Sequence, residues 1–140
     1  MPVFAVLISL FATLFGPASD PECYALGGLD VARAEALADV NLTDLRAVYA
    51  DRAAGAADAR ILRRYAARGY RIVGAGMVRG ECRVIRRSAG QVKLDVTDRL
   101  ASAWVVSEDG TARRLPRGAL ARHRIVLTGG AGAWKIASVG

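Results

Sequence analysis

Histidine, lysine and aromatic residues are scarce in this chain of 140 residues. It contains one His, two Lys against eighteen Arg, and only 6% aromatic residues. A zinc site is therefore not expected, and the core must be built from small and medium aliphatic side chains. The overall content, 53% hydrophobic and 24% charged, is that of a globular protein. The length fits one domain with a single ordinary core.

The common signatures of catalysis and cofactor binding are also missing. The sequence has no paired carboxylates, no Ser-His-Asp set, no metal-ligand cluster and no phosphate-cradling glycine motif. Gly74-Ala75-Gly76 and Gly27-Gly28 lack the strand-to-helix context that a dinucleotide loop needs. We therefore expect neither a cofactor nor a metal.

Acidic residues are fewer than basic ones, 13 against 20, and the net charge is +7. Such an excess raises nucleic acid or an anionic membrane surface as a partner. The arginines are spread from Arg33 to Arg124, however, with no run longer than two and no aromatic interleaving. This distribution favours an arginine-rich composition over a nucleic-acid groove. A basic nucleic-acid or anionic-surface binder is kept as the third hypothesis.

One long hydrophobic run is present, Pro2 to Phe15, and it carries no charge. Its fourteen residues are fewer than the roughly 20 that span a bilayer as a helix. They match the apolar region of a secretory signal peptide, and Gly16-Pro17-Ala18 supplies small residues for cleavage, although no Lys or Arg precedes the run. We expect residues 1–21 to be a signal peptide or membrane anchor that exports the domain of residues 22–140. The alternative is a buried first element of the fold.

Cysteine is limited to Cys23 and Cys82. Their spacing excludes a CxxC redox motif. In an exported protein a lone pair is expected to form one disulfide. It would close a loop of 59 residues and stabilise the fold by about 4 kcal/mol. In a cytosolic protein the two would be unrelated buried thiols.

The first half of the chain is predicted to be helical. Apolar residues recur at three- and four-residue intervals between residues 22 and 40. Asn41 is a suitable cap for a short helix over residues 42–49, and Asp58 for a third helix over residues 59–68. The arginines of this third helix are expected to form a solvated outer face.

The second half, after Gly69, is predicted to be β-structure. We expect residues 70–87 to form a long strand or a bent pair, with kinks at the glycines. Further strands are expected over residues 91–107, over 111–115 with a continuation over 122–127, and over 133–139. Asp109-Gly110 is a hairpin signal. Hairpins between sequential strands make the sheet antiparallel or mostly so, and the helices must cover its apolar face. The predicted fold class is α+β, with three N-terminal helices packed on a curved sheet.

This arrangement resembles the α+β cone (cystatin-like) of the nuclear transport factor 2-like superfamily. The resemblance covers about residues 23–139, and the segments that carry it are Val48-Tyr49, Leu62–Gly69, the strand VKLDVTDRL and the ending GAWKI. The LRRYAARG helix and VTDRL strand are similar to those of small actinobacterial envelope proteins. The resemblance implies a cone that encloses a pocket. Some members are dehydratases, isomerases or polyketide cyclases that use an Asp, His or Tyr inside the cone as acid or base.

Asp98 breaks the pattern of its strand. Period-2 alternation places it on the apolar face, between Val96 and Leu100. If the resemblance extends to catalysis, the candidate residues are Asp98, His123, Tyr65 and Tyr49, and Asp98 leads because its face is apolar. The competing interpretation is a structural carboxylate paired with an arginine, and we favour it because paired carboxylates in sheets are common.

The leading hypothesis is therefore an exported or membrane-anchored cone domain, non-enzymatic, that binds a protein partner or a small apolar ligand. Membrane contact would come from residues 2–15. The alternative is a small cyclase- or isomerase-type enzyme with Asp98 as acid or base. The two hypotheses predict different surroundings for Asp98: an arginine partner in the first, and a cavity without arginine in the second.

Overall fold

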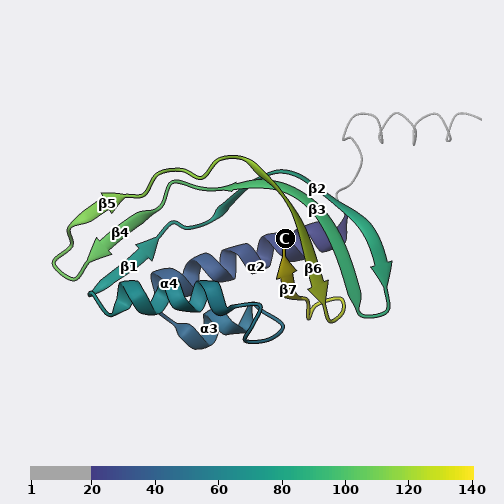
Figure 1. The fold of residues 1–140 in the computed structure, drawn as a ribbon, viewed down its shortest axis with the longest axis horizontal. Helices are drawn as coiled ribbons and strands as arrows, with labels where there is room; N and C mark the ends of the chain where they lie inside the picture. The colour runs from purple at the N-terminus through teal and green to yellow at the C-terminus, as the bar shows by residue number, and fades with distance from the viewer. Residues whose placement is uncertain (1–19) are drawn as a thin grey trace, which may run out of the picture.

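Three helices lie beneath a long arch of strands in the computed structural model, which describes residues 20–140 (Figure 1). The helices are α2 (Pro21–Ala38), α3 (Leu42–Ala47) and α4 (Ala56–Ala66). The strands are β1 (Tyr70–Val73), β2 (Met77–Ser88), β3 (Gln91–Leu100), β4 (Trp104–Ser107), β5 (Ala112–Arg114), β6 (Ala121–Thr128) and β7 (Lys135–Val139). The predicted α+β class is confirmed. The predicted leader lies outside the described residues, apart from Asp20 and Pro21.

The helices follow the predicted pattern with one correction. Asn41 caps α3, because its side chain accepts a hydrogen bond from the backbone N–H of Asp44 at 2.9 Å. Helix α4 begins directly after Gly55, so Asp58 lies within the helix and is not its cap. The prediction for Asp58 was wrong because its side chain is bound by α2, as described below. None of the helices in residues 20–140 has both the length and the apolar character needed to cross a membrane.

The strands form two antiparallel sheets, where the sequence predicted one. The smaller sheet has the order β1-β4-β5 and the larger has the order β2-β3-β6-β7. The predicted strands 70–87 and 91–107 are each interrupted, at residues 74–76 and 101–103, and the interruptions lie side by side because Ala101 donates to the carbonyl of Gly76 at 2.8 Å. Gly74 has a φ of 79°, which favours glycine. Both strands therefore leave one sheet and enter the other at the same level.

Each sheet covers its own hydrophobic core. Beneath the larger sheet the buried residues are Cys23, Leu26, Val48, Val92, Leu94, Val96, Ile125, Leu127 and Ile136. Beneath the smaller sheet they are Ala36, Leu37, Leu45, Leu62, Ile72, Ala75 and Ala103. Helix α2 contributes to both, and Tyr49 packs against both. The two cores are thus joined through α2 and Tyr49.

The start of α2 is fastened to the larger sheet. Cys23 and Cys82 form a disulfide, which is the pairing expected for an exported protein. Nearby, Glu22 accepts two hydrogen bonds from Arg87 at 3.0 Å, and Asp20 accepts one from the backbone N–H of Val84 at 2.9 Å. Helix α2 is therefore held against β2 by a covalent bond and by polar contacts.

Candidate functional site

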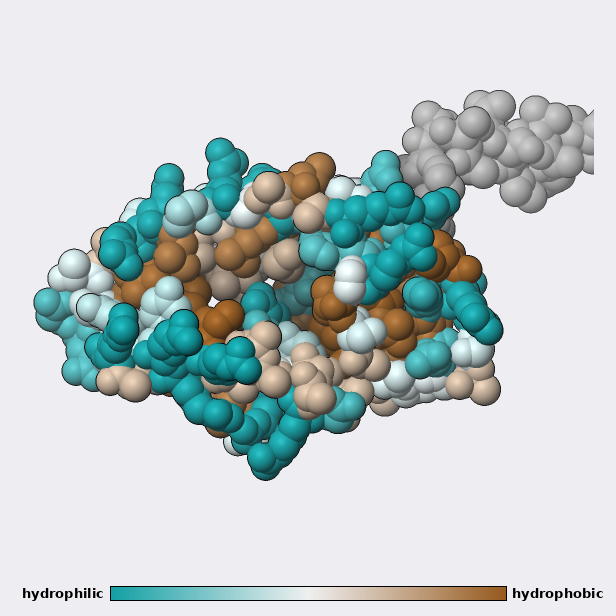
Figure 2. All heavy atoms as spheres, in the orientation of Figure 1, coloured by the Kyte–Doolittle hydropathy of each residue, from teal (hydrophilic) through white to brown (hydrophobic). Residues whose placement is uncertain are grey.

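A pocket of about 360 Å³ lies where the two cores meet. Such a volume is at the lower end of the range for small-molecule sites, about 300–1,000 Å³. Its wall is largely apolar, formed by Leu26, Ala54, Ala57, Met77, Ile125, Ile136 and Val139. Figure 2 shows that this side of the molecule is hollowed between the strands and the helices, with hydrophobic residues gathered around the hollow.

Asp98 lies on the apolar face of β3 and lines this pocket. The residue is 3% exposed. Arg79 stands opposite Asp98 in the β2–β3 register, but its guanidinium donates to Asp30 instead, and Arg99 points to the other face of the strand. Within residues 20–140 no Lys or Arg nitrogen lies at ion-pair distance from Asp98. The favoured prediction of an arginine partner was therefore wrong.

His123 of β6 reaches the same pocket. It stands opposite Val96 in the β3–β6 register, so it is a diagonal neighbour of Asp98 on the inner face. Its Nε2 lies 3.0 Å from Oδ1 of Asp98, although without hydrogen-bond geometry, and that oxygen has no hydrogen-bond partner. The His123 side chain is 31% exposed and that of Asp98 is 5% exposed. The pair therefore connects a buried acid with solvent.

Asp30 of α2 lies near Asp98 and is held by Arg79. Burial raises the pKa of Asp30; the charge of Arg79 opposes this, and the negative charge of Asp98 adds to it. Asp30 was not predicted as a site residue. It stands four positions after the buried Leu26, on the same helix face, and this spacing was the signal that could have identified it.

A second polar cluster forms another part of the wall. Arg33 of α2 donates to both oxygens of Asp58, with Nη2 at 2.9 Å from Oδ1, and the Tyr49 hydroxyl donates to Oδ2. Burial disfavours a charged Asp58, but the hydrogen bonds from Arg33 and Tyr49 outweigh it and lower its pKa. Burial and the bond to Asp58 raise the pKa of Tyr49. The cluster holds α4 against α2, and its charged and hydroxyl groups form hydrogen bonds with one another.

The remaining sequence candidate lies elsewhere. Tyr65 is half-buried against the core of the smaller sheet and does not line this pocket. The structure thus brings together Asp98, His123 and Tyr49 and leaves Tyr65 apart. Among the described residues no group of His, Cys, Asp and Glu side chains is arranged to hold a metal ion.

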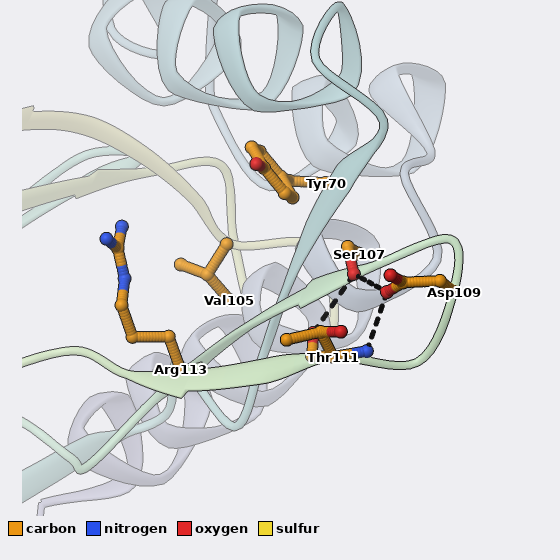
Figure 3. A pocket seen from close by; sticks show the side chains of 6 residues that line it. All are labelled: Tyr70, Val105, Ser107, Asp109, Thr111 and Arg113. Carbon is orange, nitrogen blue, oxygen red and sulfur yellow. Dashed lines mark hydrogen bonds between the residues drawn. The ribbon is translucent and has the colours of Figure 1, made fainter.

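A second hollow, of about 370 Å³, lies at the β4–β5 hairpin (Figure 3). The Ser107 hydroxyl donates to Asp109, and the backbone N–H of Thr111 donates to the same carboxylate at 2.9 Å. These hydrogen bonds lower the pKa of Asp109 to about 2. They hold the Asp-Gly turn that the sequence predicted, so Ser107, Asp109 and the backbone of Thr111 are occupied in building the hairpin.

The arginines expected at Asp98 are found at Asp95, on the outer face of the same strand. Arg122 donates to both oxygens of Asp95 at 2.8 and 2.7 Å, and Arg83 donates to Oδ2 at 3.3 Å. Nε of Arg124 lies 3.6 Å from Oδ1. The hydrogen bonds from Arg122 lower the pKa of Asp95 to about 2. Asp95 is therefore the structural carboxylate of β3.

The fold and the pocket define a cone-like α+β domain with an acid inside it. Comparison with known proteins shows the fold alone: no family model matches the chain, and no curated protein matches it. Among solved structures, the chain is similar to the protein Aln2 from a Streptomyces species. The TM-score is 0.54 at 16% identity, over 88% of this chain and 91% of Aln2.

Proposed function

We propose that this chain binds a small, largely apolar molecule in the Asp98 pocket. We also propose that Asp98 and His123 remove a proton from this molecule and return one to it. The reaction class is that of a small isomerase or cyclase. The observation that carries the proposal is the carboxylate of Asp98, 3% exposed and without an arginine partner in a mostly apolar pocket. Of the two surroundings that the sequence hypotheses predicted for Asp98, this is the one that belongs to an enzyme.

The roles of the two residues follow from their positions. A general base must lie within hydrogen-bond reach of the proton that it removes, and Oδ1 of Asp98 is a buried acceptor with no hydrogen-bond partner among the described residues. His123, at 3.0 Å and partly exposed, can return a proton to the product or pass it to solvent. Contacts of this kind are often poorly aligned in a free enzyme and tighten when the substrate binds.

Membership of the nuclear transport factor 2-like superfamily is part of the proposal. Its cone, with an acid or base inside, fits the arch of strands over helices and the position of Asp98. We also propose that the domain is exported. The disulfide supports this because such bonds persist in oxidising compartments. Mass spectrometry of the native protein should find a chain that begins near Ser19 with oxidised cysteines; a full-length cytosolic chain with free thiols would contradict export.

Hydrogen–deuterium exchange of β-tetralone tests the proton transfer. This aromatic ketone has exchangeable protons beside its carbonyl, and NMR in D2O follows their loss. We expect the protein to accelerate exchange above the buffer rate, and Asp98→Asn to reduce that protein-dependent rate by about 100-fold or more. Asp95→Asn, on the outer face of the same strand, is the matched control and should keep the wild-type rate. Equal rates for wild type and Asp98→Asn would refute the proposal.

The apolar wall favours a second candidate, a binding domain without turnover. Ile125 and Ile136 both line the pocket, so their methyl resonances report on occupancy. If β-tetralone shifts these resonances but its protons exchange no faster than in buffer, the pocket binds and does not catalyse.

A further inference from the structure

We infer that the ligand of this pocket is neutral or cationic and brings a hydrogen-bond donor, and that the pocket rejects anions although the whole chain is basic. This inference rests on the proposed function and specifies the chemical class of its ligand. It follows from which polar groups of the pocket are already occupied and which one is left over.

Each of the three nitrogens of the first guanidinium, on Arg33, already has a hydrogen-bond partner. Arg33 donates from Nε and Nη2 to Asp58, and its Nη1 lies 3.4 Å from the carbonyl oxygen of Ala75. The hydroxyl of Tyr49 also donates to Asp58. This side of the pocket therefore offers neither an unpaired positive charge nor a free hydroxyl proton to a ligand.

The second guanidinium, on Arg79, does not line the Asp98 pocket. Arg79 donates to Asp30 and, at 3.4 Å, to the carbonyl oxygen of Cys23. Its Nε is buried without a partner, but Arg79 lines a neighbouring hollow beside the disulfide and not the Asp98 pocket. An anionic ligand in the Asp98 pocket thus finds no arginine that is free to receive it.

The group left over is an acceptor. Oδ1 of Asp98 is buried and has no hydrogen-bond partner. Arg33 is paired with Asp58 and Arg79 with Asp30, so among residues 20–140 the carboxyl group of Asp98 is left without a guanidinium partner. A ligand hydroxyl or ammonium supplies the donor that this oxygen lacks, whereas a ligand carboxylate would place two like charges together in a poorly solvated site.

Three naphthalenes that carry different groups at the same ring position test the inference: β-naphthylmethylamine, β-naphthol and β-naphthoate. Each is titrated at pH 8 into the whole protein carrying labelled isoleucine methyl groups. Ile125 and Ile136 report on the pocket, while Ile72 in the smaller core and the exposed Ile85 serve as references. We expect the ammonium and hydroxyl compounds to bind at least about tenfold more tightly than the carboxylate, because juxtaposed like charges are strongly unfavourable.

Asp98→Asn is the decisive variant, with Asp95→Asn as its control. Asp98→Asn should reduce the preference for ammonium over carboxylate by about tenfold, and Asp95→Asn should leave it unchanged; an unchanged reference signal of Ile72 shows that the fold is intact. If β-naphthoate shifts Ile125 and Ile136 as strongly as the amine, the inference is overturned, while β-tetralone exchange still decides the proposed function independently. If none of the three shifts these residues, the inference and the proposed ligand site both fail.

Discussion

Asp95 and Asp98 stand three positions apart on β3 and have opposite surroundings. Asp95 is bound by Arg122 and Arg83 on the outer face, whereas Asp98 lies in the pocket beside His123 and has no Lys or Arg partner among residues 20–140. Strand alternation places positions three apart on opposite faces, so the same residue type serves two purposes within one strand. This contrast makes each residue the control for the other.

Asp95→Asn is expected to make stability less sensitive to acid. The pKa of Asp95 falls from 3.8 to about 2 in the fold, mainly through the hydrogen bonds from Arg122. A carboxylate with a lowered pKa in the folded state stabilises the protein above its unfolded pKa, and this contribution is lost as the pH drops from about 3.8 to about 2. Urea unfolding at a series of pH values should show a shallower fall for the variant in that window. Identical slopes would contradict the ion pair.

Tyr49→Phe and Asp58→Asn should differ in cost. The first removes one hydrogen bond and should lower the free energy of unfolding by about 1 kcal/mol. The second leaves the largely buried Arg33 without its counter-charge and should cost about 3–5 kcal/mol. Chemical denaturation measures both. A cost for Asp58→Asn no larger than that for Tyr49→Phe would mean that the Arg33 charge is well solvated.

At the scale of elements, α2 organises the molecule. Its first turns hold the disulfide, its middle places Asp30 and Arg33 in the pocket, and Ala36 and Leu37 enter the smaller core. The pocket therefore depends on how firmly α2 is held against β2.

Loss of the disulfide should lower the free energy of unfolding by about 4 kcal/mol, because it closes a long loop, with a sequence separation of 59 between its cysteines. The double variant Cys23→Ala, Cys82→Ala should show this cost in urea unfolding. A reductant should destabilise the wild type and leave the double variant unaffected. Equal stability of the wild type and the double variant would show that the bond contributes little.

Local patterns predicted much of these elements. Alternation identified the face of Asp98, the Asn41 cap was found from residue type, and the only two cysteines of the chain could form only one intramolecular pair. The division into two sheets was missed because residues 74–76 and 101–103 interrupt strands whose flanks both favour β-structure. An interruption shared by two strands is a tertiary feature, and neither segment shows it alone.

The pairing of charges could not be predicted from local patterns. Eighteen arginines offer too many partners for each carboxylate, and only the strand register and the helix positions decide among them. Arg79 is opposite Asp98 in the register, yet it binds Asp30 because α2 lies beneath it. The pairing of Asp98 with His123 likewise depends on β6 lying beside β3.

For the whole molecule, the net charge of +7 comes from arginines that are spread along the sequence from Arg33 to Arg124. Association with duplex DNA should therefore be nonspecific and be lost between about 50 and 200 mM salt. Fluorescence anisotropy with two unrelated DNA sequences tests this, and Asp98→Asn should behave as the wild type does. Salt-resistant binding that prefers one sequence would support the nucleic-acid hypothesis instead.

The central claim is that Asp98 is a buried carboxylate without a lysine or arginine partner among residues 20–140. The free energy of unfolding of Asp98→Asn, relative to wild type, tests it most directly, because the substitution removes the charge and keeps the shape. An unpaired buried charge is unfavourable in the folded state, so the variant should be as stable as the wild type or more stable, by about 1 kcal/mol. A loss of about 3–5 kcal/mol, expected when one member of a buried ion pair is removed, would contradict the claim.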